Sequence, residues 1–303
     1  MKLLKQLFGV IIFIVFSQSA HAALNIFACE PEWGALAVEL GGKNITLYTA
    51  TTAQQNVHHI QARPSLIAKI RQANLVVCTG AELEIGWLPV LLQRGANPRV
   101  RPGSAGYFEA ASVVNLLGRP KRLDRAEGDI HASGNPHIQM DPRNILLVAR
   151  ALSERLAALD PANKADYQAR FSAFDQRWSA AIARWQLAAA PLKNMPIVVH
   201  HDSWLYLTQW LGLNVVASLE PKPGIPPSAG DLSALLQKLQ KQPVKIIIHA
   251  AYENARPDQW LAQRANIPAV TLPFTVGGTP GANDLYGLFD DTIARLLTGL
   301  KAS

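Results

Sequence analysis

Short β-branched runs alternate with helical stretches along this chain, and they do so in two similar halves. Such alternation is the signature of βαβ units, which build parallel sheets covered by helices. The sequence therefore predicts an α/β fold of two lobes, each with a mostly parallel sheet flanked by helices. The expected strands are Leu24–Ala28, Asn44–Thr49, Asn74–Cys78 and a weak fourth near Arg99–Arg101 in the first half, and Pro196–His200, Asn214–Leu219, Val244–His249 and Ala269–Pro273 in the second.

A helical region separates the two halves. One helix is expected to begin at Asp141-Pro142, because Asp suits an N-cap and Pro suits the first turn. A second is expected from Asp160-Pro161 to about Ala190, long enough to link the lobes. Its apolar residues recur every three or four positions and predict a buried stripe: Tyr167, Phe171, Phe174, Trp178, Ile182 and Trp185. The predicted divisions are a signal peptide (1–22), an N-terminal lobe (23–159), the linking helix (160–191) and a C-terminal lobe (192–303).

The first 22 residues have the order of a secretory signal. Lys2 and Lys5 precede the apolar run Leu7–Phe16, and Ala20-His21-Ala22 provides an A-x-A cleavage site. The run is shorter than the ~20 residues that span a bilayer. A lipoprotein signal at Cys29 is disfavoured, because this cysteine lies thirteen residues beyond the apolar run. We therefore expect a cleaved signal and a periplasmic protein.

Export allows the two cysteines, Cys29 and Cys78, to pair, because the compartment is oxidising. Each closes an apolar strand-like run, and the ends of neighbouring parallel strands can lie within the ~4.4–6.8 Å between Cα atoms that a disulfide requires. The bridge would stabilise the fold by roughly 4 kcal/mol in the chain-entropy model. Two separate buried thiols are the alternative.

Composition and short motifs exclude several classes of protein. Two of the 29 basic residues lie in 1–22, which leaves 27 against 22 acidic residues. They are scattered, so we expect no nucleic-acid partner. The chain contains no H-E-x-x-H, G-x-S-x-G, Walker or G-x-G-x-x-G sequence. Their absence argues against the common zinc proteases, serine hydrolases and nucleotide-binding enzymes.

Histidines gather where a parallel α/β sheet binds its ligands, at the carboxyl ends of strands. All of those beyond the signal lie in expected loops or at strand ends: His58, His59, His131, His137, His200, His201 and His249. Neutral imidazole is the commonest metal ligand. The pattern therefore predicts a metal site built from both halves.

Two segments of the first half resemble the metal-binding periplasmic solute-binding proteins of ABC transporters. Residues 56–65 are similar to the family motif D-P-H-x-[YI]-E-x-x-P-S, with Asn-Val in place of D-P and Gln in place of Glu. The spacing to the Pro-Ser pair implies His58 as the first ligand, with His59 as the alternative. Residues 135–142 resemble the N-P-H-x-x-x-D-P element, which implies His137 as the second ligand.

The second half carries the rest of the resemblance. Residues 201–206 are similar to the family's H-x-S-W-x-Y segment, which implies His201 as the third ligand and leaves His200 to pack or to form a hydrogen bond. An Asp two residues before a Tyr implies Asp284 as the fourth ligand, although an Asp that opens a helix can instead cap it. Glu253 is the alternative carboxylate. His131 is expected to be an exposed loop residue without metal, or else to gate or pre-bind the ion.

The resemblance implies a solute-binding protein without enzymatic activity that holds its metal in the cleft between the lobes. Three imidazoles and one carboxylate favour Zn²⁺ over Mn²⁺, which prefers more oxygen ligands. Four protein ligands also leave no open position for a catalytic water. The short loop 124–134 makes any loop-based scavenging of zinc minor.

We therefore expect a monomer that captures Zn²⁺ as cargo and delivers it to an ABC transporter permease. A periplasmic metallochaperone is a further candidate partner. The alternatives are a binder of Mn²⁺ or of a metal chelate and, less favoured, a secreted zinc hydrolase.

Overall fold

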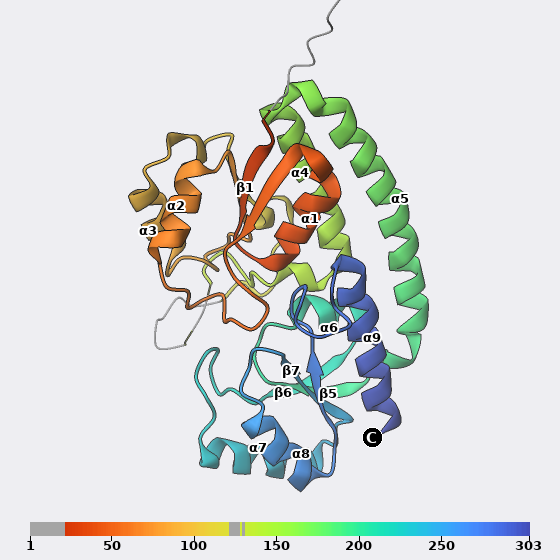
Figure 1. The fold of residues 1–303 in the computed structure, drawn as a ribbon. Coiled ribbons are helices and arrows are strands. Elements are labelled where there is room, and N and C mark those ends of the chain that lie inside the picture. Colours follow the sequence, from red (N-terminus) through yellow and green to blue (C-terminus); the bar gives the residue numbers. More distant parts are fainter. Residues whose placement is uncertain (1–21, 121–127, 129–130) are drawn as a thin grey trace, which may run out of the picture.

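Two parallel four-stranded sheets form the two lobes of the protein, as the sequence predicts (Figure 1). The computed structural model describes residues 22–120, 128 and 131–303; all of the predicted signal peptide except Ala22, and most of the loop 124–134, lie outside this part. The N-terminal sheet has the order β2-β1-β3-β4 and the C-terminal sheet the order β6-β5-β7-β8. The strands are β1 (Leu24–Ala28), β2 (Ile45–Thr49), β3 (Leu75–Cys78), β4 (Tyr107–Glu109), β5 (Pro196–Val199), β6 (Asn214–Ser218), β7 (Ile246–Ala250) and β8 (Ala269–Leu272).

The fourth strand of the first sheet corrects the sequence prediction. Residues Pro98–Val100 form a 3₁₀ helix, and the strand that pairs with β3 is Tyr107–Glu109. The side chain of Asn97 accepts a hydrogen bond from the Arg99 N–H group at 3.1 Å. This local bond competes with strand pairing, and a proline in the segment removes one ladder donor.

Helices cover both sheets. In Figure 1, α2 and α3 lie on one side of the N-terminal sheet and α1 and α4 on the other, whereas α7 and α8 lie below the C-terminal sheet. No helix of the described residues is long and apolar enough to cross a membrane. The helices are α1 (Pro31–Gly41), α2 (Pro64–Gln72), α3 (Leu88–Gly95), α4 (Pro142–Leu159), α5 (Lys164–Ala188), α6 (Leu205–Leu211), α7 (Ala229–Lys241), α8 (Arg256–Ala265) and α9 (Leu285–Lys301).

The 25-residue helix α5 links the two lobes and runs along both of them (Figure 1). Arg177 pairs with Glu39 of α1 at 2.8 Å, and further along the helix Arg184 pairs with Asp290 of α9 at 3.0 Å. The helix begins four residues after the predicted Asp160, because Pro161–Asn163 first form a 3₁₀ turn. Its aromatic stripe packs into the core, with four members buried: Tyr167, Phe174, Trp178 and Trp185.

One hydrophobic core runs through both lobes. It includes Leu36 of α1, Val148 of α4, Ile248 of β7 and Leu288 of α9. Trp178 of α5 contacts Phe289 of α9 with ring centroids 5.7 Å apart. The lobes are therefore joined by packed side chains as well as by the linking helix.

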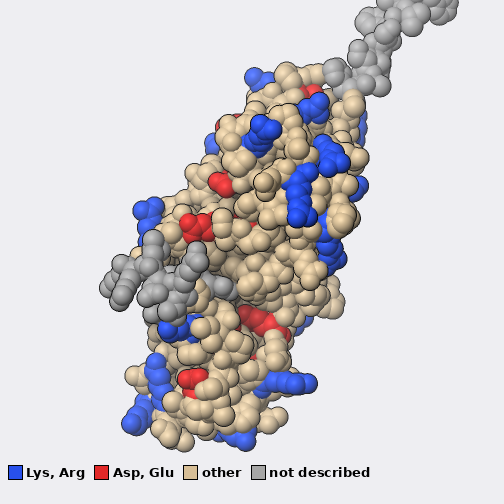
Figure 2. Space-filling model, turned by 90° about the vertical axis from the view of Figure 1, so that its left-hand side faces the viewer, with Lys and Arg blue, Asp and Glu red and all other residues tan. Residues whose placement is uncertain are grey.

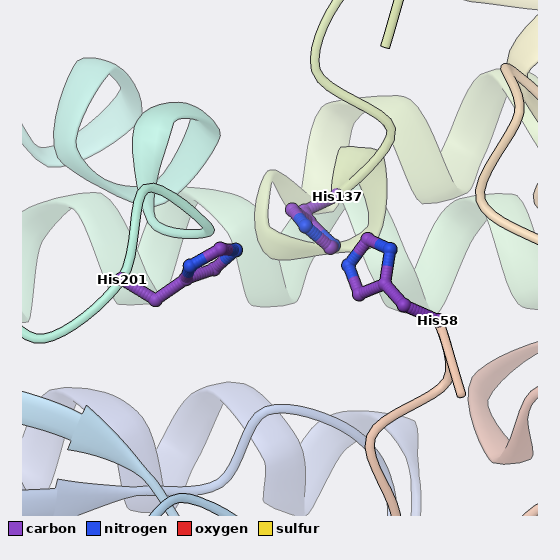
Figure 3. Close-up of side chains that lie close together, drawn as sticks. All are labelled: His58, His137 and His201. Atoms are coloured by element: carbon purple, nitrogen blue, oxygen red, sulfur yellow. The ribbon is translucent and has the colours of Figure 1, made fainter. Parts of the chain in front are cut away.

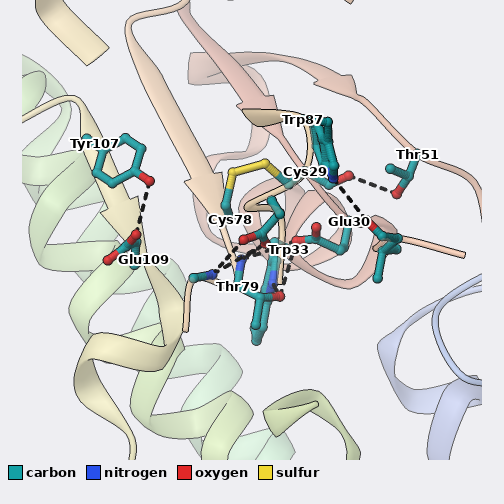
Figure 4. The surroundings of a disulfide bond; sticks show 12 residues. Cys29, Glu30, Trp33, Thr51, Cys78, Thr79, Trp87, Tyr107 and Glu109 are labelled. Atoms are coloured by element: carbon teal, nitrogen blue, oxygen red, sulfur yellow. Dashed lines mark hydrogen bonds between the residues drawn. A yellow bond between two sulfur atoms is a disulfide. The ribbon is translucent and has the colours of Figure 1, made fainter. Parts of the chain in front are cut away.

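The predicted disulfide between Cys29 and Cys78 is present (Figure 4). It joins the carboxyl ends of β1 and β3, which are neighbours in the sheet, across a Cα–Cα distance of 4.8 Å. Both cysteines are fully buried. The cross-link limits the unfolded chain and thereby stabilises the fold by roughly 4 kcal/mol.

Candidate metal centre

Three of the four predicted ligands come together between the lobes (Figure 3). One nitrogen each of His58, His137 and His201 lies within 4.8 Å of the other two. Their ring centroids are 5.4 Å, 6.1 Å and 6.3 Å apart. His58 lies in the loop between β2 and α2, His137 just before α4, and His201 between β5 and α6. Two lobes thus contribute to one cluster.

The two histidines of the N-terminal lobe are held by the same kind of turn. In each case the side-chain oxygen of an asparagine two residues earlier accepts the backbone N–H group of the histidine. Asn56 accepts from His58 and Asn135 accepts from His137, both at 3.0 Å. An asparagine side chain that bonds the backbone two residues on forms such a turn by itself. Asn135 also donates to the carbonyl of Asp202 at 2.7 Å, which ties this turn to the other lobe.

His201 is oriented by a carboxylate. Its Nδ1 lies 2.6 Å from Oε2 of Glu220, and Figure 3 shows its ring pointing toward the other two histidines. Metal-binding histidines are commonly held in this way, because the carboxylate fixes the tautomer and makes the opposite nitrogen a better ligand. Glu220 was not predicted from the sequence. The strand order could have indicated it, since Glu220 closely follows β6, the neighbour of β5.

Burial keeps two of the imidazoles neutral. It lowers the pKa of His58 to about 3, with nearby histidines adding to the effect, and lowers the pKa of His137 well below its usual value for the same reasons. For His201 burial acts in the same direction, but the hydrogen bond and charge of Glu220 outweigh it and raise the pKa. Neutral imidazole is the form that binds a metal.

Two ring nitrogens of the cluster are buried without a hydrogen-bond partner among the described residues: Nε2 of His58 and Nδ1 of His137. Burying an unpaired polar atom costs about 1–3 kcal/mol. A metal ion that accepted such a lone pair would remove this cost. The donor set therefore fits a cation better than an apolar or anionic ligand.

A small cavity of about 50 Å³ lies at the cluster. A cavity needs only about 10–15 Å³ of such volume to hold a water molecule, so this one has room for an ion. It is lined from both lobes, by Gly118, Pro120, His131, Asn135, His137, His201, Asp202 and Pro223.

The structure does not bring the predicted fourth ligand to this cluster. The carboxylate of Asp284 caps α9, accepting the N–H group of Gly287 at 2.7 Å, and the residue is exposed. The alternative, Glu253, turns back to accept the N–H group of Ala250 at 2.6 Å. Among the described residues, the group of mutually close ligand atoms at the three histidines contains no carboxylate. In Asp284, Oδ1 is engaged in capping the first turn of the helix.

The remaining histidines fall into different positions. His59 is exposed, and His200 is buried in the C-terminal lobe with its Nδ1 2.7 Å from Asp258, as expected for a packing residue. His131 differs from the expectation of an exposed loop residue. It is partly buried, its ring stacks on that of His58 at 5.1 Å between centroids, and it lines the cavity.

Figure 2 shows Lys and Arg side chains on both the upper and the lower part of the molecule, with several along the right-hand side of the upper part and a few acidic side chains away from them.

Solved structures share this fold. A crystal structure of ZnuA has a TM-score of 0.75 at 20% identity and covers 92% of this chain and 99% of that one. A manganese-bound periplasmic metal-binding protein from Candidatus Liberibacter asiaticus has a TM-score of 0.73 at 17% identity, with 91% and 99% covered.

Relatives in sequence match over most of the chain. The metal ABC transporter substrate-binding lipoprotein SloC of Streptococcus mutans is 20% identical over 292 residues, with 94% of this chain and 92% of the relative covered. The manganese ABC transporter substrate-binding lipoprotein PsaA of Streptococcus pneumoniae is 23% identical, with 86% and 82% covered.

The matching family model covers residues 26–299. It describes solute-binding proteins of metal ABC transporters, which are not enzymes, so the resemblance first drawn from four short motifs extends over nearly the whole chain. On this evidence the chain is a metal ABC transporter substrate-binding protein and belongs to the family of the periplasmic component A of zinc-uptake complexes, ZnuA.

Proposed function

We propose that this protein captures Zn²⁺ as cargo with His58, His137 and His201 and delivers it to the membrane permease of an ABC transporter. The observation that carries the proposal is the convergence of three ring nitrogens within 4.8 Å of one another. Two of these rings carry a buried nitrogen without a hydrogen-bond partner among the described residues. Two buried neutral imidazoles, each with an unpartnered ring nitrogen, are costly unless something binds to them.

The donor set supports zinc over manganese. Imidazole nitrogen suits Zn²⁺, which binds it at about 2.0–2.1 Å, whereas Mn²⁺ favours carboxylate, carbonyl and water oxygens. Within the described part of the chain, the group of mutually close ligand atoms holds three ring nitrogens and no carboxylate oxygen, while Asp202 lines the neighbouring cavity. Some relatives are named for manganese, and manganese is therefore the competing ion in the test.

The size of the cavity argues against a chelate binder and against a hydrolase. A volume of about 50 Å³ favours a single ion over a metal chelate or the substrate of a hydrolase. The order of charged, apolar and small residues in 1–22 supports export to the periplasm with cleavage after Ala22. Action as a monomer and transfer from a metallochaperone belong to the same proposal.

Equilibrium dialysis against equal concentrations of Zn²⁺ and Mn²⁺, followed by metal analysis, tests the proposal. We expect one zinc per chain and little manganese. His58→Ala, His137→Ala and His201→Ala should each lose zinc at concentrations that saturate the natural protein. His59→Ala, a histidine from the same loop as His58, should keep it. Preferential binding of manganese, or zinc retained by the three single variants, would contradict the proposal.

A further inference from the structure

His131 lies beside the clustered histidines, although the sequence analysis expected an exposed loop residue or one that gates or pre-binds the ion. We propose that His131 supplies a fourth imidazole to the bound ion and so takes the coordination position for which the sequence nominated Asp284. The inference rests on the proposed function, because it concerns the same ion. It assigns to this chain an all-nitrogen metal site.

His131 lies next to two of the three clustered rings, although its ring nitrogens fall outside the group of ligand atoms within 4.8 Å of one another. Its ring centroid lies 5.1 Å from that of His58 and 6.4 Å from that of His137. The three clustered rings are themselves separated by 5.4 Å to 6.3 Å. Imidazoles bound to one tetrahedral zinc would have centroids ~5 Å apart. His131 is therefore already at the expected spacing from His58, and its ring must move toward His137 and His201 to share one ion.

The cavity supports the same assignment. His131 lines it together with His137 and His201, and so faces the space that an ion would occupy. The carboxylate that could have filled the fourth position caps α9 instead. Zinc in a protein site without catalysis is almost always four-coordinate. Among the protein side chains at the cavity, His131 is the imidazole that can complete the set.

A strained turn holds the loop that carries His131. Oε2 of Glu82 accepts the N–H group of Ala132 at 2.6 Å. Glu82 and Ala81 have φ values of 69° and 50°, in the left-handed region that residues with a Cβ atom seldom adopt. Such strain costs about 1–3 kcal/mol and persists where the surrounding structure over-determines it. In this conformation the carboxylate of Glu82 reaches the backbone of Ala132, the residue next to His131.

A fourth imidazole would sharpen the choice of ion. Four nitrogen ligands suit Zn²⁺, whereas Mn²⁺ would lose the oxygen ligands it favours. Carboxylates around the site can balance the charge of the ion without binding it, because Glu220 holds His201 and the charges of Glu253 and Asp202 also reach that ring. His131 would thus act as a specificity-determining ligand.

The test counts imidazoles directly. Protein labelled with ¹⁵N at its histidine rings is loaded with ¹¹³Cd²⁺, and each coordinated ring nitrogen then shows a scalar coupling to the metal. We expect four coupled rings in the natural protein and three in both His131→Ala and His131→Gln, each still binding one ion. His59→Ala, the matched control, should keep four.

Dialysis with Zn²⁺ and Mn²⁺ gives a second readout. We expect His131→Ala to bind zinc at least tenfold more weakly and to lose part of its preference over manganese. Three coupled rings in the natural protein, with unchanged zinc affinity in both variants, would overturn the role of His131 and leave the proposed function standing. Failure of the natural protein to bind zinc at all would overturn both.

Discussion

Each of the three clustered histidines, His58, His137 and His201, is held in position by a hydrogen bond to a neighbouring side chain. Asn56 and Asn135 fix the backbone of His58 and His137, and Glu220 fixes the ring of His201. Glu220 also accepts the N–H group of Gly224 at 2.7 Å, which steadies the carboxylate itself. Binding geometry therefore depends on residues that need not touch the ion.

Replacing Glu220 tests this dependence. In Glu220→Gln the side chain keeps its shape but loses its charge, so Nδ1 of His201 is held less firmly and its opposite nitrogen becomes a weaker ligand. We expect zinc affinity to fall by about 10–100-fold with a stoichiometry of one. Competition with a chromophoric chelator measures the change. Glu39→Gln, which removes a surface partner of Arg177, serves as the control, and an equal loss there would refute a specific role.

The buried carboxylate of Glu32 makes stability depend on pH. Burial raises its pKa to about 7 from 4.5, against the opposing hydrogen bond from Thr275 of the other lobe. Between these values the folded protein binds more protons than the unfolded chain, so this group's contribution to stability falls as the pH rises through the window. The contribution of Glu32 to the stability of the fold is therefore least favourable above about pH 7.

Urea denaturation of the zinc-free protein at several pH values checks this expectation. Glu32→Gln resembles the neutral carboxyl group, so its unfolding free energy should decline less than that of the natural protein between pH 5.5 and pH 7.5. The difference should be on the order of 1–3 kcal/mol. Parallel profiles for the two proteins would show that Glu32 does not titrate in this range.

Local spacing in the sequence predicted three residues that the structure places close together. His58, His137 and His201 stand at fixed distances from Pro-Ser, Asp-Pro and Ser-Trp pairs, and the structure brings them together. Asp284 shows the limit of this reasoning, because one spacing serves either a ligand or a helix cap. Glu220 and His131 reach the site only through strand order and loop packing, which spacing does not encode.

The segment between β3 and α3 braces the loop that carries His58. Nε1 of Trp87 donates to the carbonyl of Val57 at 2.9 Å, directly before His58. A Cβ atom on Gly86 would lie 3.1 Å from the carbonyl oxygen of His58, so the two backbones approach closely. Trp87 belongs to the same buried cluster as Cys29 and Cys78 (Figure 4). The disulfide region and the metal centre are thus mechanically connected.

Trp87→Phe should weaken zinc binding. The ring keeps most of its packing but loses the hydrogen bond to Val57, which is worth about 1 kcal/mol, so zinc affinity should fall about fivefold. Isothermal titration measures it. Trp185→Phe removes a partly buried indole hydrogen bond, to the carboxylate of Asp290, in the linking helix. The Trp185→Phe control should have a lower melting temperature but the same zinc affinity as the natural protein. Equal losses of affinity in the two variants would contradict a specific role of the Trp87–Val57 hydrogen bond in zinc binding.

Most elements could be predicted because their signals are local and regular. Seven of the strands lie within two residues of the predicted runs, since buried parallel strands are short apolar stretches. Asp141 and Pro142 fixed the start of α4, where the Asp side chain accepts the Arg143 N–H group at 2.9 Å. The position of β4 could not be predicted from the sequence. This strand has only three residues, which pair with β3, and the turn at Asn97 is held by a hydrogen bond to Ile70 of α2, a tertiary contact that local sequence does not reveal.

The two lobes are tied together across the whole molecule. Tyr206 donates to the carbonyl of Asn135 at 2.8 Å, and Asn135 in turn donates to the carbonyl of Asp202. The hydroxyl group of Thr275 donates a hydrogen bond to the carboxylate of Glu32, and the hydrophobic core is continuous from one lobe to the other. Wide opening of the lobes would break these bonds and expose apolar surface, which packed cores resist.

Zinc binding should therefore change the overall shape little. Small-angle X-ray scattering of the zinc-free and zinc-loaded protein should give radii of gyration that agree within experimental error. The local rearrangement should be confined to the loops that carry the histidines. A clear compaction on adding zinc would instead indicate hinge closure of the lobes and would contradict the shared core as a restraint.

The proposed function requires ring nitrogens from both lobes to meet at one cation. Anomalous diffraction at the zinc edge, from crystals of the zinc-loaded protein, locates that cation without reference to affinity or stability. We expect a single strong peak between the lobes, about 2.0–2.1 Å from a nitrogen of His58, of His137 and of His201. A strong peak bound elsewhere, with these three rings left without metal, would contradict it.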